Sequence, residues 1–185
     1  MNNQKYLALI ILLTPLLVIS LSTLTFYLGY KPTSSNNNGD LIIPQIDTED
    51  LSLLDVEGKT FSFAPGKWYL VHFDDFQNIT FSLDRYKLAT SLKLTLPRES
   101  HRLRRIVVYK DIELFERAAD LKDLFPEVIF LYDKNNLFEK RISAQLNNPY
   151  FSKSMFLIDS FSNVMEEFNL SLTFNEIFED LKVLL

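Results

Sequence analysis

The stretch Trp68–Ala89, WYLVHFDDFQNITFSLDRYKLA, contains the two patterns that decide the fold. It begins within Lys67–Phe73, a run of apolar and β-branched residues that is typical of a buried strand. A polar loop follows. Beyond the loop, leucines recur every four residues until a proline interrupts them, which predicts a helix over Ser82–Leu96. The stretch therefore predicts a strand, a loop and a helix in succession.

The same two patterns alternate through the rest of the chain. Short apolar runs predict further strands at Arg104–Tyr109, Val128–Tyr132, Ser154–Asp159 and Val164–Phe168. Helical spacing predicts helices over Asp111–Phe125, Asn135–Leu146 and Thr173–Leu185. We expect Asn135 or Asn136 to cap the second of these helices, and a capping box between Thr173 and Glu176 to open the third.

Strands that are separated by helices favour parallel βαβ units, whereas the last two strands, joined by a short turn, must be antiparallel. Gly58 predicts an additional hairpin within residues 51–63. A βαβ half followed by a ββα half around one mixed sheet is the thioredoxin architecture. The sequence thus predicts an α/β fold with a thioredoxin-like mixed sheet flanked by helices.

The segment Tyr6–Tyr30 carries no charged residue and is long enough to cross a bilayer as a helix. A cleaved signal peptide is the alternative, but its apolar core is shorter, and no small-residue cleavage site follows here. We expect an uncleaved anchor. Lys5 and the N-terminal amine outnumber Lys31 on the other side, which predicts a cytoplasmic N-terminus and a domain outside.

Three regions follow from these patterns. Residues 1–30 form a cytoplasmic stub and a transmembrane anchor, and residues 47–185 form the thioredoxin-like domain. Between them, residues 31–46 are predicted to be a flexible tether, because Pro, Ser, Asn and Gly dominate its first part.

Composition excludes several functions. From Asp40 onward the chain carries all 24 acidic residues and 17 of the 19 basic ones, a net charge of −7, which disfavours nucleic acid as a partner. The chain contains no cysteine, so thiol redox catalysis, disulfides and thiolate metal sites are excluded. With only two histidines, a zinc site built on several imidazoles is not expected either.

Two motifs resemble a known family. LLDVEGKTFSFAPGKWYLVHFDD and MFLIDSFSNVMEEF resemble the opening and closing segments of membrane-anchored thioredoxin-like proteins of the Sco/SenC type. The layout is most similar to a small proteobacterial family encoded beside cytochrome c oxidase genes. Sco proteins bind copper with a C-x-x-x-C pair and a distant histidine. The resemblance places these ligands near Asn78, Ser82 and Phe151, none of which supplies a thiolate or an imidazole.

The loop after the strand at 67–73 has two interpretations. His72, Asp74 and Asp75 lie where sites gather in α/β sheets, and the carboxylates suggest a cation site or a metal-dependent enzyme. The alternative is structural: His72 lies within the strand and the aspartates cap the next segment. We favour the structural interpretation and expect no cofactor, no metal and no catalytic residue. Asp74, Asp75, Asn78 and Ser82 are then a degenerate active-site loop.

The one basic cluster in this acidic domain is RESHRLRR, residues 98–105. It suggests a surface for an acidic partner or for anionic lipid headgroups. The alternative is a solvated loop between helix and strand. The candidate partner-binding residues are Arg98, Arg102, Arg104 and Arg105.

These observations predict a non-enzymatic binding module tethered to the bacterial inner membrane, with its domain in the periplasm. The family resemblance implies a protein partner in the assembly or stabilisation of a respiratory cytochrome c oxidase. A metal-dependent enzyme using Asp74, Asp75 and His72 and a constitutive structural subunit of a membrane complex are the alternatives.

Overall fold

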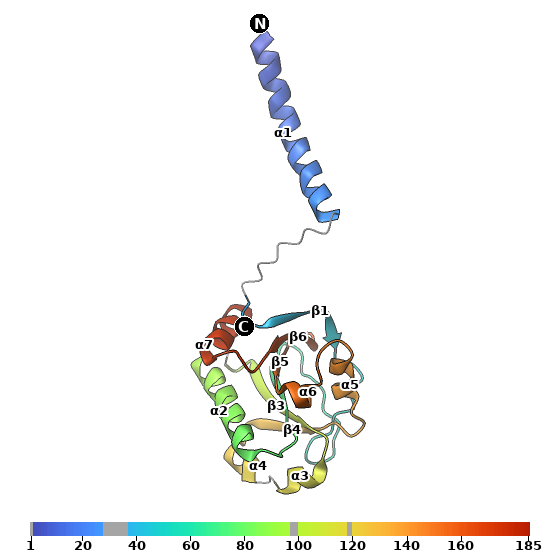
Figure 1. Ribbon diagram of the computed structural model, residues 1–185, viewed down its shortest axis with the longest axis vertical. Coiled ribbons are helices and arrows are strands. Elements are labelled where there is room, and N and C mark those ends of the chain that lie inside the picture. Colours follow the sequence, from blue (N-terminus) through green and yellow to red (C-terminus); the bar gives the residue numbers. More distant parts are fainter. Residues whose placement is uncertain (1, 28–36, 97–99, 118–119) are drawn as a thin grey trace. The chain divides into compact units, whose positions relative to one another are not determined.

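One mixed sheet forms the centre of the domain, with its strands in the order β1-β6-β5-β2-β3-β4 (Figure 1). The strands are β1 (Asp40–Asp47), β2 (Trp68–Phe73), β3 (Leu103–Tyr109), β4 (Val128–Tyr132), β5 (Met155–Ile158) and β6 (Asn163–Phe168). Strands β2, β3 and β4 are parallel, β5 is antiparallel to β2, and β6 pairs antiparallel with both β5 and β1. This is the predicted α/β topology.

The computed structural model describes residues 2–27, 37–96, 100–117 and 120–185. The helices in these ranges are α1 (Asn2–Tyr27), α2 (Ile79–Thr95), α3 (Ile112–Arg117), α4 (Asp120–Leu124), α5 (Leu137–Ser143), α6 (Pro149–Ser152) and α7 (Phe174–Leu184). Side chains alternate along β2, so Leu70 packs with α2 and α7 while Val71 and Phe73 pack with α5 and α6. The two helix layers therefore cover opposite faces of the sheet.

Helix α1 is the only helix in the described ranges that is long and apolar enough to cross a membrane, over Gln4–Thr25. This apolar span of 22 residues is long enough to match the thickness of the hydrocarbon core of a bilayer. A membrane anchor and a signal sequence both satisfy this criterion.

The predicted tether of residues 31–46 is wrong at its C-terminal end. The domain begins at Asn37, and β1 adds an edge strand to β6. Ile42 and Ile46 of β1 are buried in the core. Pro44 argues against a central strand, but an edge strand tolerates a proline because one side of its backbone needs no partner. Residues 31–36 lie outside the described residues.

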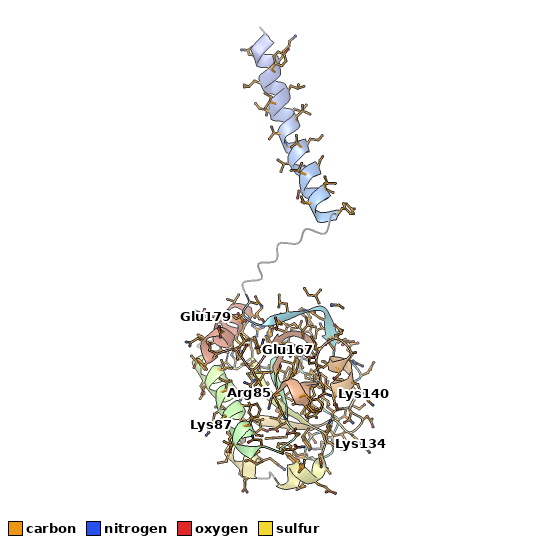
Figure 2. The ribbon with its side chains drawn as sticks, viewed as in Figure 1. Arg85, Lys87, Lys134, Lys140, Glu167 and Glu179 are labelled. Atoms are coloured by element: carbon orange, nitrogen blue, oxygen red, sulfur yellow. The ribbon has the colours of Figure 1, made fainter. Side chains whose placement is uncertain are left out.

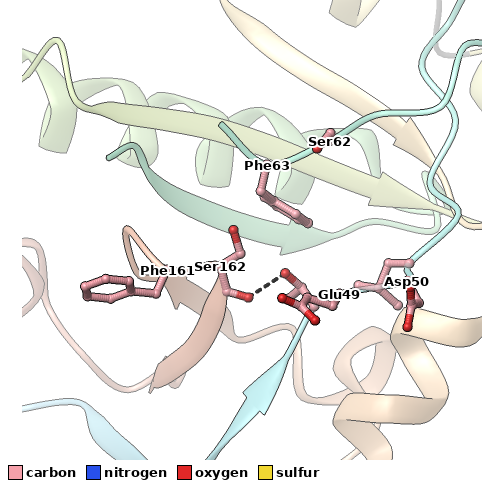
Figure 3. A pocket seen from close by; sticks show the side chains of 8 residues that line it. Glu49, Asp50, Ser62, Phe63, Phe161 and Ser162 are labelled. Atoms are coloured by element: carbon pink, nitrogen blue, oxygen red, sulfur yellow. Dashed lines mark hydrogen bonds between the residues drawn. The ribbon is translucent and has the colours of Figure 1, made fainter. Parts of the chain in front are cut away.

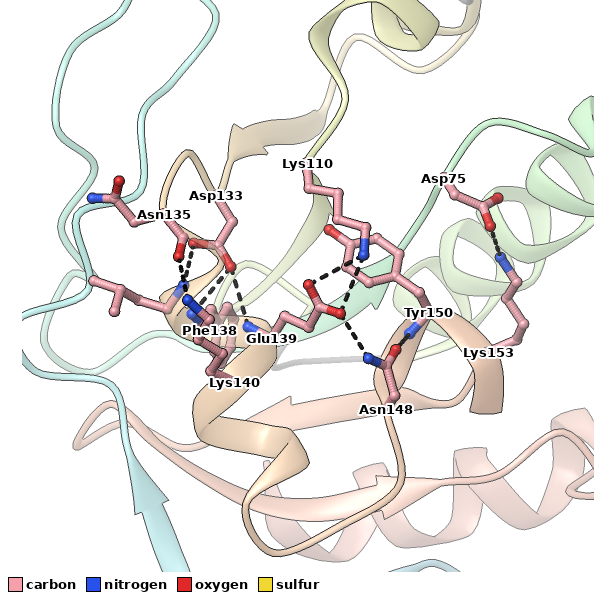
Figure 4. Close-up of polar contacts among 11 residues, drawn as sticks. Asp75, Lys110, Asp133, Asn135, Phe138, Glu139, Lys140, Asn148, Tyr150 and Lys153 are labelled. Atoms are coloured by element: carbon pink, nitrogen blue, oxygen red, sulfur yellow. Dashed lines mark hydrogen bonds and ion pairs between the residues drawn. The ribbon is translucent and has the colours of Figure 1, made fainter.

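Two further predictions need correction. The helix expected over 111–125 is instead two short helices, α3 and α4, with residues 118 and 119 outside the described part. Asn136 is the N-cap residue of α5, as one of the two predicted alternatives, but its side chain makes no capping hydrogen bond. The buried carboxylate of Asp133 accepts the first three backbone N–H groups of α5, at 2.9–3.1 Å (Figure 4). Asn136 adopts a left-handed conformation that turns the chain from β4 into this cap.

The hairpin predicted within residues 51–63 is a tight turn at Gly58, reduced to one bridge between Leu54 and Thr60. The capping box of α7 is confirmed, because Thr173 and Glu176 each accept the other's backbone N–H. Ile177 and Leu181 then place the apolar stripe of α7 against the sheet.

Candidate functional site

The loop after β2 begins with a buried aspartate that is fully engaged. Asp74 is 2% exposed, and its backbone N–H donates to Val108 O on β3. Its Oδ1 accepts the Phe76 N–H at 2.8 Å, and its Oδ2 accepts the Tyr86 hydroxyl at 2.6 Å. Burial and then the Asp74 charge raise the pKa of Tyr86, so this hydroxyl remains a donor. Asp74 therefore ties the loop to α2 rather than facing a ligand.

The second aspartate forms an ion pair at the rim of the loop. Asp75 accepts a hydrogen bond from Lys153 Nζ at 2.9 Å, and both side chains are about a quarter exposed (Figure 4). Burial alone would raise the pKa of the Asp75 carboxyl, but Lys153 and the Gln77 N–H outweigh burial and lower it. Lys153 occupies the left-handed C-cap of α6, so the pair joins α6 to the β2 loop.

Asn78 and Ser82 form the start of α2. Asn78 is its N-cap and accepts the Phe81 N–H at 3.1 Å, while the fully buried Ser82 hydroxyl donates to Asn78 O. The prediction that the aspartates cap the following helix is therefore wrong. Asp74 and Asp75 instead accept N–H groups two residues ahead and form the turn that leads to Asn78.

His72 lies inside β2, as the structural interpretation predicted. Its ring is 5% exposed and lies between the rings of Phe81 and Tyr86. Burial lowers the pKa of His72 to about 4, although Asp74 opposes the shift, so the imidazole is neutral near pH 7. Among the described residues no group of three or more Asp, Glu or His side chains can share a metal ion, so the metal alternative built on Asp74, Asp75 and His72 gains no support.

Arg105 does not contribute to the predicted basic surface. Adjacent residues on β3 point to opposite faces, so Arg104 is exposed while Arg105 is buried beneath α2. Arg105 bonds to Thr90 and forms a 2.9 Å ion pair with Glu127. Arg102 donates to the backbone oxygen of Leu185. Arg98 lies outside the described residues.

Three residues that shape this site carry no prediction from the sequence: Arg85, Tyr86 and Lys153. The helical spacing did indicate that Arg85 and Tyr86 are buried, because both lie on the same face of α2 as its buried leucine. The pairing of Lys153 with Asp75 joins residues far apart in the chain, and no local pattern indicates it.

A separate cavity of about 360 Å³ lies at the opposite end of β2, where the β5–β6 turn meets the segment after β1 (Figure 3). Thr48 donates from its backbone and its hydroxyl to Ser162 O, and Arg141 donates to the carbonyls of Asp47 and Glu49. These contacts hold the segment against the turn. The cavity is the space left between these two loops and the segment that contains Ser62 and Phe63.

Known structures share this arrangement of sheet and helices. BsSco matches with a TM-score of 0.57 and 16% identity, covering 76% of this chain and 94% of its own. Copper-bound ScoI from Bradyrhizobium japonicum matches with a TM-score of 0.53 and 18% identity, covering 80% and 99%. A thioredoxin-like protein from Porphyromonas gingivalis matches with a TM-score of 0.55 and 20% identity, covering 72% and 88%. The domain has a thioredoxin-like fold.

This thioredoxin-like domain shows no further relationship at the level of sequence: no protein-family model matches the chain, and no curated protein matches it. The identities of 16–20% establish the fold alone.

The residues of the thioredoxin-like loop do not fit copper. Copper(I) prefers sulfur ligands, and the chain contains no cysteine. Asn78 and Ser82 are also used by the start of α2, as described above, and Phe151 has no ligand atom in its side chain. No step of any reaction can therefore be assigned to copper at this loop.

Proposed function

We propose that this protein is a non-catalytic binding module that is held at the bacterial inner membrane by α1, with its thioredoxin-like domain in the periplasm. We further propose that it assists the assembly or stability of a respiratory cytochrome c oxidase. BsSco, which shares the fold, is described as a member of the Sco family of cytochrome c oxidase assembly proteins. The fold and the sequence motifs support a related role for this chain.

The proposal depends on one observation: the polar side chains of the loop after β2 bind other groups of the domain. Asp74, Asp75, Asn78 and Ser82 all hold backbone or side-chain partners within the domain. A general base or a nucleophile needs a lone pair or a proton directed at a substrate. A loop in which these groups serve the scaffold is better suited to recognition by shape.

The anchor gives such a module a physical advantage. The apolar part of α1 is 22 residues long, which exceeds the apolar core of a signal peptide and favours an uncleaved span. Tethering two binding partners to one membrane raises their effective concentration to about millimolar. A weak contact surface is then sufficient for a membrane partner.

Deletion of the gene tests this proposal. We expect a reduced content of haem–copper oxidase in membranes, measured from haem absorbance and oxygen consumption, with rescue by the full chain but not by a version without α1. Normal oxidase content in the deletant would contradict the proposal. Co-purification with the oxidase at fixed stoichiometry in detergent would instead identify a constitutive structural subunit.

A further inference from the structure

Strand β4 is an edge strand whose outer side is only partly occupied (Figure 1). Near its end, Tyr132 exchanges two backbone hydrogen bonds with Leu54, at 2.7 and 3.1 Å. The next residue, Asp133, donates instead to Tyr109 O on β3, as the alternation of backbone groups along a strand requires. By the same alternation, the backbone N–H and C=O of Phe130 point away from β3. Within the described part of the chain, nothing bonds to these two groups.

The open part of this edge is short. Val128 donates its N–H to Phe125 O at 3.0 Å, whereas its carbonyl points outward like that of Phe130. The chain runs antiparallel to β4 only as far as Leu54, and it then turns at Gly58. Among the described residues, three backbone groups along this edge therefore lack a partner: the N–H and C=O of Phe130 and the C=O of Val128.

A cavity of about 220 Å³ gives access to these groups. Val128, Ile129 and Phe130 all line it. Successive side chains of a strand point to opposite faces, so a cavity that contacts three successive residues lies beside the backbone itself. Val56 also lines the cavity and is 52% exposed. Another segment of polypeptide can therefore reach the edge of β4 from solvent.

The two edges of the sheet differ in how they are protected. Natural edge strands are commonly blocked by prolines and charged residues. Strand β1, at the other edge, contains Pro44 and has Asp40 and Asp47 at its ends. Strand β4 contains neither kind of residue, since its sequence is VIFLY. These are residues of high β propensity, so β4 is the edge that is suited to pairing with a further strand.

We propose that an extended segment of a partner protein binds at this edge and adds an antiparallel strand to β4. One residue of the segment exchanges two hydrogen bonds with Phe130, and the residue two positions later donates its N–H to Val128 O. The segment takes the place that the chain itself leaves when it turns away after Leu54. This inference rests on the proposed function and deepens it, because it names the surface through which the module contacts its partner.

Charge and the neighbouring surface define the partner segment. The charged residues that line the cavity are Asp55 and Lys122, whose charges balance, so an uncharged segment matches it. Pro126 lines both this cavity and a second one of about 290 Å³. Leu94 and Leu124 border the second cavity and are 76% and 64% exposed. Apolar side chains of the segment can therefore be buried beside the edge.

A second copy of this chain fits the edge less well. From Asp40 onward each copy carries a net charge of −7, so two copies repel each other. A symmetric antiparallel pair of β4 edges centred on Ile129 forms two hydrogen bonds, from each Phe130 N–H to the other copy's Val128 O, because the Val128 N–H is already used. A partner segment uses all three unpaired groups.

The test uses the full chain in non-ionic detergent micelles, with ¹⁵N-labelled phenylalanine and isoleucine. The probe is the uncharged peptide acetyl-Thr-Val-Thr-Val-Thr-amide, which is titrated while the Phe130 amide resonance is recorded. We expect a saturable downfield shift of the Phe130 N–H, because it gains a hydrogen bond, and no shift at Ile43 on β1. At ten times the dissociation constant, hydrogen exchange at Phe130 should slow by about tenfold.

Two controls connect the response to the edge. Val56→Arg places a charged side chain at the cavity and should weaken peptide binding by about tenfold, because the guanidinium must be desolvated. Val183→Arg is the matched control, since Val183 is 80% exposed on α7 and does not line the cavity, and it should leave binding unchanged. The same peptide N-methylated at its second and third residues carries a methyl group on each backbone edge and should not bind the wild-type chain.

Three results would overturn the proposal: no response of Phe130 to the peptide, an equal response to the N-methylated peptide, or a response at Ile43 in place of Phe130. A Phe130 shift that grows with protein concentration in the absence of peptide would also overturn it, and would assign the edge to a second copy of the chain. These measurements do not depend on the deletion phenotype, so the β4 edge and the oxidase role can fail separately.

Discussion

The first residues of the domain contact a buried carboxyl group, that of Glu166, which makes stability depend on pH. Glu166 of β6 is fully buried, and Asp180 of α7 is 4% exposed. Asn37 donates to one oxygen of Glu166 at 2.9 Å, and the other oxygen is unpartnered. Asp180 accepts the backbone N–H groups of Asn38 and Gly39, both at 2.8 Å. If Glu166 loses its proton, its negative charge therefore lies near the Asp180 carboxylate that binds the backbone of Asn38 and Gly39.

The size and sign of the effect follow from the shift in pKa. Burial raises the pKa of Glu166 from the ordinary 4.5 to about 7, Asn37 opposes the shift, and Asp180 and Asp40 add to it. The folded domain therefore holds the proton more tightly than the unfolded chain. The stabilisation is complete below pH 4.5 and is lost as the pH rises through 7. The difference in pKa corresponds to about 3 kcal/mol of unfolding free energy.

Glu166→Gln removes this titration, because the Gln amide does not lose a proton in this pH range. The amide N–H₂ can also still donate toward Asp180. Unfolding of the full chain by urea in micelles is followed by fluorescence of Trp68, the single tryptophan, which is 8% exposed in the domain core. We expect the unfolding free energy of the wild type to fall by up to about 3 kcal/mol relative to that of the variant between pH 4.5 and 8. The comparison with the variant is needed because the lowered pKa of His72 makes stability rise with pH in both proteins.

Glu179→Gln is the matched control, since Glu179 is a largely exposed carboxylate on the same helix as Asp180 (Figure 2). Its pH profile should follow that of the wild type. A Glu166→Gln profile that runs parallel to the wild-type profile from pH 4.5 to 8 would refute the reasoning.

Three further substitutions test individual contacts. Tyr86→Phe leaves a buried oxygen of Asp74 without its hydroxyl donor and should cost about 1–3 kcal/mol in urea unfolding, whereas an unchanged midpoint would show that water replaces the hydroxyl. Gly39→Ala places a Cβ 2.8 Å from Glu166 Oε1 and from the ring of Phe168, so we expect a lower melting temperature and faster amide exchange at Gly39 and Asp40; wild-type exchange would contradict the close approach. Thr173→Ala removes the N-cap of α7 and should cost about 1 kcal/mol, measured by thermal unfolding, and a loss below 0.3 kcal/mol would show that the cap is redundant.

Local sequence patterns were sufficient for most of the sheet. The strand Val128–Tyr132 has the predicted bounds, because it is buried on both faces and every position is apolar or aromatic. Helix α2 begins three residues earlier than predicted, at Ile79, directly after its N-cap Asn78. Strand β1 was missed, because an edge strand with a proline lacks the continuous apolar run of a central strand.

Sequence patterns predicted less of the candidate site, because its contacts join side chains from segments that are far apart in the chain. The Tyr86–Asp74 hydrogen bond depends on the packing of α2 over β2, and the Asp75–Lys153 pair depends on the placement of α6. Sequence spacing identifies which face of a helix is buried. It does not identify a charge on that face that lacks a partner, and this property distinguishes Arg85 from Arg105, which is paired with Glu127.

In this chain without cysteine, the polar residues of the loop after β2 stabilise the start of α2. Asn is a stronger N-cap than most residues, so Asn78 stabilises α2 by about 1 kcal/mol relative to a residue without a capping oxygen. Ser82 is fully buried, and its hydroxyl is satisfied by the helix itself. Cysteines introduced at these two positions would remove a cap and place one sulfur in a closed interior. The loop is now held in place by helix capping and by the Asp74–Tyr86 hydrogen bond, so its rigidity does not require a metal.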